Sequence, residues 1–353
     1  MTIADIRTHR LVNQRIATAD FTTPVDLVCH LGAIQAQEYA LAKWAIGLRM
    51  QSATDSMIEE AFNNGNILRT HILRPTWHFI APADIRWMLS LSGPRVQAFN
   101  AYYYRKEGLD AAMFKRCNKV IAKTLRGNNC LTRNEIADAL SQSRISAAGT
   151  ALACIMMNAE LEGLVCSGPR RGKQFTYALL DDKAPHATPI NHDEALAKLT
   201  LLYFSTRGPA TLSDFVWWSG LSMKDAKAGV AMAGKQLITE EVNGSTYYLQ
   251  PSILTNNKSH QATFLMPDYD EYGISYKDRS AIYIPDPSHK FDRTGGAVFN
   301  HALVIDGEIA GTWRRTIEGK KHLAEALPFG PLSKTKQQVV DKAVKKYVAF
   351  ANN

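Results

Sequence analysis

The feature that most constrains the fold is an order of helices and strands that first occurs over residues 112–180. Apolar residues recur at helical spacing in the first part of this segment and give it one buried face. Thr132 then stands three residues before Glu135, which is the pattern of a capping box at a helix start. A polar turn over 141–146 precedes another apolar helix that ends near Gly163. The segment therefore predicts three consecutive helices.

Two strand-like runs follow the third helix and enclose a basic turn. The runs are LVCSG and QFTYALL, and the turn contains Arg170, Arg171, Gly172 and Lys173. Three helices and a strand pair are typical of a winged helix, whose wing commonly meets the DNA backbone. Basic side chains at such a tip favour contact with phosphate over an ordinary solvated charge run.

The same order recurs over 192–250. It contains two capping boxes and a two-residue type I′ turn: Thr211 with Asp214, Ser222 with Asp225, and Asn243 with Gly244. The strand before this turn carries Glu240 and Glu241, which makes the second wing a poor partner for phosphate. We therefore expect the two copies to differ in role.

The remaining segments complete a prediction of four domains. Residues before 111 show a looser version of the pattern, with a helix starting at Pro24, and residues beyond 261 turn to strands and a closing helix from Lys334 to Phe350. The predicted class is α+β, mainly helical, with tandem winged-helix modules and a β-containing C-terminal region. The predicted domains are 1–110, 111–185, 186–258 and 259–353.

Composition limits the partners and the compartment. The 353 residues carry a formal net charge of +8, which favours a polyanionic partner. An apolar run of membrane-spanning length and a signal peptide are both missing, so we expect a cytoplasmic protein with no membrane partner. The five cysteines form no CxxC pair and lie in apolar patterns, which predicts reduced thiols in the core. We expect neither disulfides nor a zinc site.

Several common enzyme classes are excluded because their sequence motifs are absent. The chain has no Walker loop, no dinucleotide-binding glycine fingerprint, no GxSxG and no HExxH. The acidic residues Asp268, Asp270 and Glu271 could bind a divalent cation, but no ligand loop of known spacing accompanies them. We favour a structural role, with Arg279 as a nearby ion-pair partner, and predict neither metal nor cofactor.

Gln35 and Gln37 form a pair of amides around one small residue. If the segment is extended, both side chains point the same way and could hold one water molecule. An amide can orient water but cannot remove its proton, so this pair suits only a reaction whose leaving group is already good. Spacing alone favours two ordinary surface or capping glutamines.

Further basic residues mark two other strand pairs. Arg69, Arg74, Thr76 and His78 lie on a predicted pair whose alternation places the last three on one face. A cationic face of this kind suits phosphates, and an ordinary solvated sheet face explains it equally well. Arg314 and Arg315 follow Trp313 on a C-terminal hairpin and could contact DNA or pack on the indole ring.

These blocks together resemble the AlkZ and YcaQ type winged-helix DNA glycosylases. The resemblance covers nearly the whole chain and is carried by the tandem modules and by HLGAIQAQ, LRTHILRPTWHFIAPAD, LMPDYDEYG and VIDGEIAGTWRR. It implies that the modules form a basic DNA channel and that Gln35 and Gln37 are the catalytic Gln-x-Gln motif. Pro75 and Trp77 depart from the family pattern.

The resemblance implies a monofunctional DNA glycosylase that removes alkylated bases from duplex DNA. Alkylation at N7 of guanine makes the base cationic and weakens its glycosidic bond, so two amides that position water could suffice. The Gln-x-Gln branch includes an enzyme that unhooks interstrand crosslinks. The alternatives are a transcription regulator and a non-catalytic damage sensor, because fold alone does not decide function. No dimerisation helix is evident, and we expect a monomer.

Overall fold

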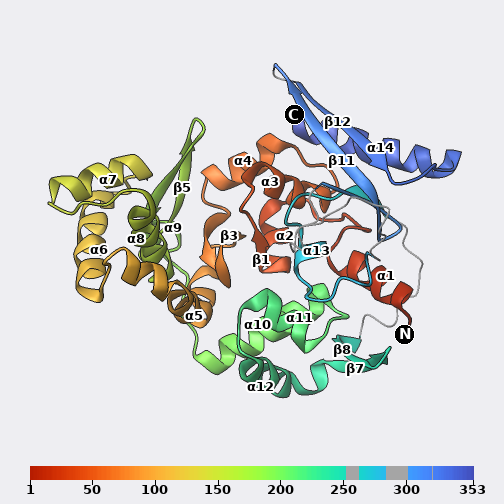
Figure 1. Cartoon of the computed structure of the whole chain (residues 1–353), viewed down its shortest axis with the longest axis horizontal. Coiled ribbons are helices and arrows are strands. Elements are labelled where there is room, and N and C mark those ends of the chain that lie inside the picture. Colours follow the sequence, from red (N-terminus) through yellow and green to blue (C-terminus); the bar gives the residue numbers. More distant parts are fainter. Residues whose placement is uncertain (252–261, 284–300, 320) are drawn as a thin grey trace. The chain divides into compact units, whose positions relative to one another are not determined.

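The computed structural model describes residues 1–251, 262–283, 301–319 and 321–353 (Figure 1). These residues form two compact units. The first unit comprises 1–59, 196–218 and 222–353, and the second comprises 60–195 and 219–221. Helices predominate over small sheets, so the predicted α+β, mainly helical class is confirmed. The predicted domain boundary between 258 and 259 lies outside the described residues.

The second unit contains the predicted helices and wing of the first winged-helix module. Its elements are α6 (Ala111–Leu125), β4 (Leu131–Thr132), α7 (Arg133–Gln142), α8 (Gly149–Leu161), β5 (Val165–Arg171), β6 (Gln174–Leu179) and α9 (Leu180–Lys183). The apolar faces of α6, α7 and α8 share one core, which includes Ile121, Ile136 and Ile155. The strands form a sheet in the order β4–β6–β5, so the wing is tied to the start of α7. Figure 1 shows α6, α7 and α8 gathered beside β5.

Local sequence signals set the ends of these helices. The Thr132 hydroxyl accepts from the Glu135 amide at 3.3 Å, and the Glu135 carboxylate accepts from the Thr132 amide at 2.7 Å. This capping box satisfies donors that the first turn of α7 would otherwise leave open. Gly163 follows α8 with φ of 67°, a left-handed conformation that glycine adopts without strain.

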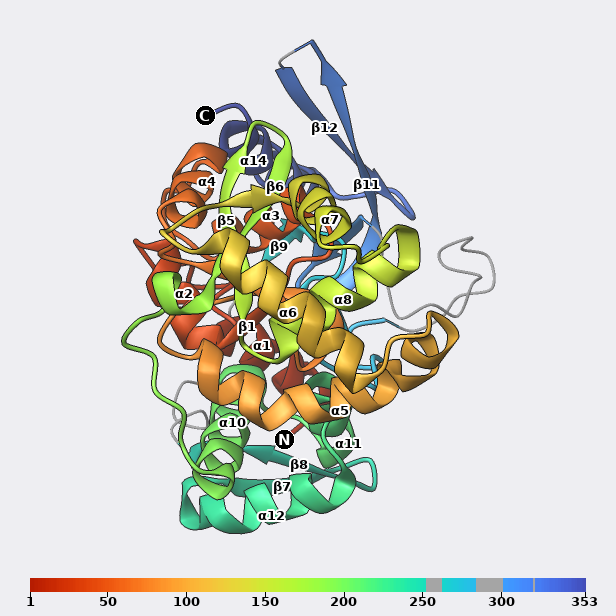
Figure 2. The same cartoon turned by 90° about the vertical axis from the view of Figure 1, so that its left-hand side faces the viewer.

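A strand pair and a long helix precede this module in the second unit. They are β2 (Leu68–Ile72), β3 (Arg74–Ile80) and α5 (Ile85–Lys106). The strands are antiparallel, with Thr70 opposite His78 and His71 opposite Trp77. Figure 2 shows the helix α5 from the side. This helix contains Pro94 in its interior and was not predicted from the sequence.

The first unit begins with α1 (Ile3–Asn13), α2 (Pro24–Leu31), β1 (Ala33–Gln35), α3 (Tyr39–Leu48) and α4 (Asp55–Asn63), which extends past residue 59. The helix start predicted at Pro24 is confirmed, and the Thr23 hydroxyl accepts from the Asp26 amide there. Gly32 ends α2 with φ of 75° and turns the chain into β1. Gln35 is thus the last residue of a short buried strand.

The second winged-helix pattern lies mainly in the first unit. Its elements are α10 (His192–Arg207), α11 (Leu212–Ser219), α12 (Met223–Ala233), the 3-10 turn η1 (Gly234–Gln236), β7 (Ile238–Val242) and β8 (Ser245–Leu249). The predicted capping box at Ser222 and Asp225 is present. Asn243 and Gly244 both have positive φ, as a type I′ turn requires.

A sheet in the order β12–β11–β10–β9 and the helix α14 close the first unit. They are β9 (Thr263–Leu265), α13 (Glu271–Ile274), β10 (Ala302–Ile305), β11 (Glu308–Glu318), β12 (Lys321–Pro328) and α14 (Lys334–Ala351). The hairpin turn predicted at Asp306 and Gly307 joins β10 to β11. Strand β12 was not predicted, because its residues KHLAEALP lack a β-branched pattern.

The cysteines only partly match the expectation of core thiols. Cys117, Cys154 and Cys166 are buried, whereas Cys29 is exposed on α2 and Cys130 is half-buried. The prediction was wrong for Cys29 because the apolar run around it belongs to an amphipathic helix with one face outside. Among the described helices, none combines the length and apolar character of a membrane span.

Candidate functional site

Gln35 lies buried at the end of β1, with 7% of its surface exposed. Its side-chain oxygen Oε1 is buried and accepts no hydrogen bond from the described residues. A buried acceptor in this condition is uncommon, because burial removes the water that would otherwise satisfy it. Gln35 therefore presents an amide oxygen that is ready to accept a hydrogen bond.

The main chain of Gln35 is held by Glu271, which is remote in sequence. The Glu271 Oε1 atom accepts from the Gln35 amide at 3.0 Å, and Glu271 is completely buried. Its Oε2 atom accepts from Arg207 Nη2 at 2.9 Å, from Trp218 Nε1 at 2.9 Å and from Ser275 Oγ at 2.6 Å. A buried carboxylate needs this many donors to offset the loss of hydration.

Arg207 extends the same network to the strand. It donates from Nη1 to the Leu31 carbonyl at 2.8 Å and from Nη2 to the Ala33 carbonyl at 2.9 Å. The fully buried Arg207–Glu271 pair therefore holds both ends of β1, at the Ala33 carbonyl and the Gln35 amide. We call Arg207, Glu271, Trp218 and Ser275 the β1 support.

Gln37 has a different environment. Strand β1 ends at Gln35, and Gln37 lies in a bend with an exposed side chain. The alternation that would point both side chains the same way therefore does not extend to Gln37. Of the two amides, only Gln35 is positioned by regular structure.

The acidic residues of the MPDYDEYG block have structural partners. Asp270 forms a fully buried bidentate pair with Arg49, with both distances at 2.8 Å. Asp268 accepts from the His301 amide at 2.7 Å. The expected partner was wrong, since Arg279 instead donates to the Gly273 carbonyl. Asp270 and Glu271 pair with Arg49 and Arg207, which lie far away in the sequence, so local spacing cannot indicate these partners.

The β2–β3 strand pair divides its predicted DNA-binding residues between two faces. The pairing of Thr70 with His78 places Thr76 and His78 on one face, and His78 is fully buried with Nδ1 2.9 Å from the Thr76 carbonyl. Arg69 lies on the other face, where its guanidinium stacks 4.3 Å from the Trp77 ring. Arg74, half-buried, begins β3 next to the turn.

The wing lies beside this ribbon. Arg69 also stacks 4.5 Å from the Phe175 ring, and Arg170 stacks 5.0 Å from the same ring. The Arg69 amide donates to Ser167 on β5 at 2.7 Å. Two of the predicted basic residues are therefore brought together over one aromatic side chain.

Arg171 and Lys173 at the wing tip are exposed. Arg171 pairs with Glu135 at 2.7 Å and donates to the Cys130 carbonyl at 2.7 Å. The Thr132 amide and Arg171 together lower the pKa of Glu135 to about 2. The wing tip thus has one tethered arginine and one exposed lysine.

The C-terminal arginines lie on β11. Arg314 is 67% exposed and pairs with Glu325 on β12 at 2.6 Å. Arg315 is half-buried next to Tyr347, where its positive charge opposes the rise in the pKa of Tyr347 that burial causes. Trp313 is buried and donates from Nε1 to the Met266 carbonyl at 2.9 Å, so its role is in packing.

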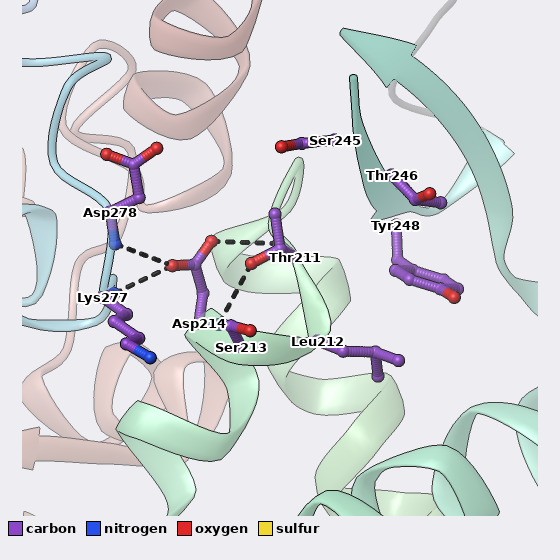
Figure 3. A pocket seen from close by; sticks show the side chains of 9 residues that line it. All are labelled: Thr211, Leu212, Ser213, Asp214, Ser245, Thr246, Tyr248, Lys277 and Asp278. Carbon is purple, nitrogen blue, oxygen red and sulfur yellow. Dashed lines mark hydrogen bonds between the residues drawn. The ribbon is translucent and has the colours of Figure 1, made fainter. Parts of the chain in front are cut away.

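A pocket of about 660 Å³ in the first unit contains none of the predicted site residues. Figure 3 shows Asp214 at its side, with one carboxylate oxygen accepting from the Thr211 amide and the other from the Lys277 and Asp278 amides. These bonds are 2.8 to 3.2 Å long and fix the start of α11 to a neighbouring loop. Asp214 is therefore a structural cap.

Sequence reasoning did not find the β1 support. Glu271 was considered only as part of an acidic cluster, and Arg207 was not singled out. No local pattern indicates these contacts, because Arg207 and Trp218 lie 64 and 53 positions from Glu271 in the sequence.

Comparison with known proteins identifies the family. The profile of the family described as DNA glycosylase AlkZ-like matches residues 28–350. The interstrand DNA cross-link repair glycosylase of Streptomyces sahachiroi is 23% identical over 307 residues, covering 82% of this chain and 81% of that protein. The solved structure of Streptomyces sahachiroi DNA glycosylase AlkZ has a TM-score of 0.83 at 18% identity, covering 99% of this chain and 97% of the other, and shows the same fold.

The profile match favours an enzyme over the non-catalytic regulator and the damage sensor considered from the sequence. The chain belongs to the AlkZ-like family of DNA glycosylases, which are hydrolases of N-glycosyl bonds.

Proposed function

We propose that this glycosylase removes N7-alkylated guanine from duplex DNA as a monomer, with Gln35 and Gln37 positioning the attacking water. The observation that carries the proposal is the buried Gln35 Oε1 atom, to which the described residues donate no hydrogen bond. Water is a donor that such an acceptor can hold in a fixed orientation. The Gln-x-Gln motif of the family resemblance maps onto the same residue.

The chemistry requires little from the protein beyond position. The water oxygen forms a bond to C1′ of the sugar while the bond from C1′ to N9 breaks. The electron pair of the broken bond stays on the base and neutralises its positive charge. The water then loses a proton to the solvent and leaves an abasic sugar. Since the amide oxygen accepts a hydrogen bond but no proton, catalysis comes from orientation. No lysine attack is involved.

The β1 support suits this role because it fixes Gln35 through the main chain. The Gln35 amide and the carbonyls of Leu31 and Ala33 are all bonded to buried charged groups. A misplacement of about 1 Å can reduce a rate roughly 100-fold, so rigid support has a direct effect on rate.

DNA contact is assigned to the basic residues of the ribbon, the wing and the C-terminal hairpin. Arg171, Lys173 and Arg314 are exposed and suit phosphate. Arg69 and Arg170 stack over Phe175 and suit a supporting role beneath the wing. The remaining proposed contacts are Arg74, Thr76 and Arg315, whereas the fully buried His78 suits a supporting role behind them.

Interstrand crosslinks are the proposed wider substrate class. The relative from Streptomyces sahachiroi is named for the repair of such crosslinks. A crosslink through N7 of guanine has the same cationic leaving group as a methylated base, so the same positioned water would serve both.

The test is excision from duplex DNA that carries one N7-methylguanine, followed by alkaline cleavage and sizing. We expect the Gln35→Ala, Gln37→Ala double variant to lose about 100-fold or more in single-turnover rate. Gln51→Ala is the matched control, because Gln51 is an exposed amide in the same unit. Gln37→Asp should retain activity, since a carboxylate also accepts from water.

Two results would contradict the proposal in different ways. Lack of excision by the wild-type protein would refute the substrate class. Full activity of the double variant would leave the substrate class intact and refute the role of the two glutamines.

A further inference from the structure

The helix α5 has an exposed aromatic face that the proposed function does not use. Phe99, Tyr102 and Tyr103 are 68%, 62% and 47% exposed. Three large aromatic side chains within five residues of one helix are unusual at a surface, because burial of apolar surface favours the folded state. Their spacing places them on one side of the helix. We call them the α5 stripe.

The stripe continues into a groove of about 500 Å³ within the second unit. Phe99 and Val96 line the groove from α5. Leu73 and Pro75 line it from the β2–β3 turn. The lining is mainly apolar, and a flat ring could lie in it.

Positive charge flanks the groove and the stripe. Arg74 and Arg95 line the groove, and Arg105 and Lys106 are exposed at the far end of α5. The described residues that line the groove include no carboxylate. An apolar surface with arginines at its edges is complementary to an aromatic, anionic ligand.

The groove has a defined backbone frame. Arg95 donates from Nε to the Gly220 carbonyl at 2.6 Å, which fixes the guanidinium at the groove edge. Gly220 has φ of 70°, and a Cβ atom there would lie 2.4 Å from the Leu73 carbonyl oxygen. The two chain segments therefore approach as closely as only glycine permits.

We propose that the α5 stripe and this groove bind unpaired DNA, with bases stacked on the aromatic rings and phosphates next to Arg74 and Arg95. Stacking platforms flanked by basic residues are the usual means of binding single strands, because every base has an aromatic face. A paired duplex keeps its bases stacked on one another and would leave the stripe unused. The inference rests on DNA as the partner in the proposed function and is independent of Gln35 and Gln37.

The consequence is a preference for lesions next to a single-stranded region. A base-paired duplex and a duplex with a single-stranded tail should differ in affinity, and the difference should depend on the stripe. Tyr102 and Tyr103 already pack edge to face at 5.4 Å, so the rings are partly ordered before DNA arrives.

The test measures fluorescence anisotropy with two labelled probes, a blunt duplex and the same duplex with a ten-thymidine tail. The wild-type protein should bind the tailed probe more tightly. Phe99→Ala with Tyr103→Ala should reduce that advantage at least about fivefold, while the affinity for the blunt duplex stays unchanged. Excision from the blunt duplex should also be unchanged, which separates this surface from the catalytic proposal.

Two control variants keep the inference falsifiable. Phe99→Tyr with Tyr103→Phe keeps both rings and should retain the preference for the tail. Met57→Ala removes an exposed apolar side chain elsewhere and should have no effect. Equal binding of both probes by the wild-type protein would overturn the inference. So would a stripe variant that binds the tail normally but loses self-association in sedimentation, because the stripe would then be a protein contact.

Discussion

The β1 segment and the β5–β6 wing are held in opposite ways. Gln35 is buried, and its main chain is bonded to Glu271, which is itself fully buried with Arg207. The wing tip is exposed, and Arg171 there is tethered to a surface carboxylate, Glu135, and to the Cys130 carbonyl. One segment is fixed by charges from distant parts of the chain, and the other by its own hairpin and a neighbouring helix cap.

This difference corresponds to two different requirements. A group that orients one water molecule must not move, and buried bonds provide that rigidity. A group that contacts phosphate must reach a charged, hydrated partner. An exposed basic side chain can do this, because it already lies at the surface and contact with phosphate releases counterions from the DNA. Substitutions in the two segments should therefore have effects of different size and kind.

The largest effect is expected from Glu271→Ala. Removal of one partner leaves Arg207 buried without its charge partner, which should lower the free energy of unfolding by about 3–5 kcal/mol. Excision should fall about 100-fold, because β1 loses its anchor. Urea unfolding and single-turnover excision at low temperature measure the two effects.

Glu308→Ala is the matched control, since Glu308 forms an exposed ion pair with Arg7 and should contribute at most about 1 kcal/mol. Glu271→Gln keeps an oxygen that can accept from the Gln35 amide and should retain more activity than Glu271→Ala. In a Gln35→Ala background, Glu271→Ala should reduce the rate much less than in the wild type. Equal losses in both backgrounds would show that Glu271 does not act through Gln35.

An intermediate effect is expected at the wing. Arg171→Ala with Lys173→Ala should weaken binding to duplex DNA and reduce the slope of log affinity against log salt by about 2, roughly one for each lost phosphate contact. The excision rate at saturating protein should stay the same, because the wing is not part of the β1 support. Filter binding from low to moderate salt measures the slope.

The control removes the same charge elsewhere. Lys342→Ala with Lys345→Ala deletes two exposed lysines from α14 and should change the slope less. A wing variant with an unchanged salt slope would contradict phosphate contact at this tip.

The smallest effect concerns the pH dependence of the wing tether. The Thr132 amide and Arg171 lower the pKa of Glu135 to about 2, so the Glu135 carboxylate stabilises the folded state above its ordinary pKa of 4.5. That contribution is lost as the pH falls from 4.5 through about 2. Arg171→Ala should raise this pKa only partly, because the Thr132 backbone bond is the larger cause.

Carbon-detected NMR of the Glu135 carboxyl group measures this titration directly. Glu135→Gln serves as the reference in unfolding experiments across the same pH range, and high salt should reduce only the Arg171 part. A wild-type pKa near 4.5 would show that neither the Thr132 backbone bond nor the Arg171 pair is formed in solution.

Local signals predicted much of the fold. The capping boxes at Thr132 and Ser222 and the turn at Asn243 depend on residues within a few positions of each other, and all three are present. Helix α5 and strand β12 were missed for a different reason. Pro94 within α5 disfavours a helix locally, and the polar residues of β12 form a strand only by pairing with β11.

The candidate site was predicted less completely. The family motif singled out Gln35 and Gln37, but their unequal burial depends on where β1 ends. Glu271 in the β1 support is 64 positions from Arg207 and 236 positions from Gln35. Sequence spacing carries no information about such pairs. The contact of Arg69 and Arg170 with one ring is equally non-local.

The bond between Glu271 and residue 35 runs through the backbone amide. Every amino acid except proline supplies that N–H group, so the identity of side chain 35 is independent of how the strand is anchored. The scaffold could therefore exchange this side chain during evolution or in the laboratory without redesigning its support. New bond-breaking specificities could be selected at position 35 on an unchanged framework.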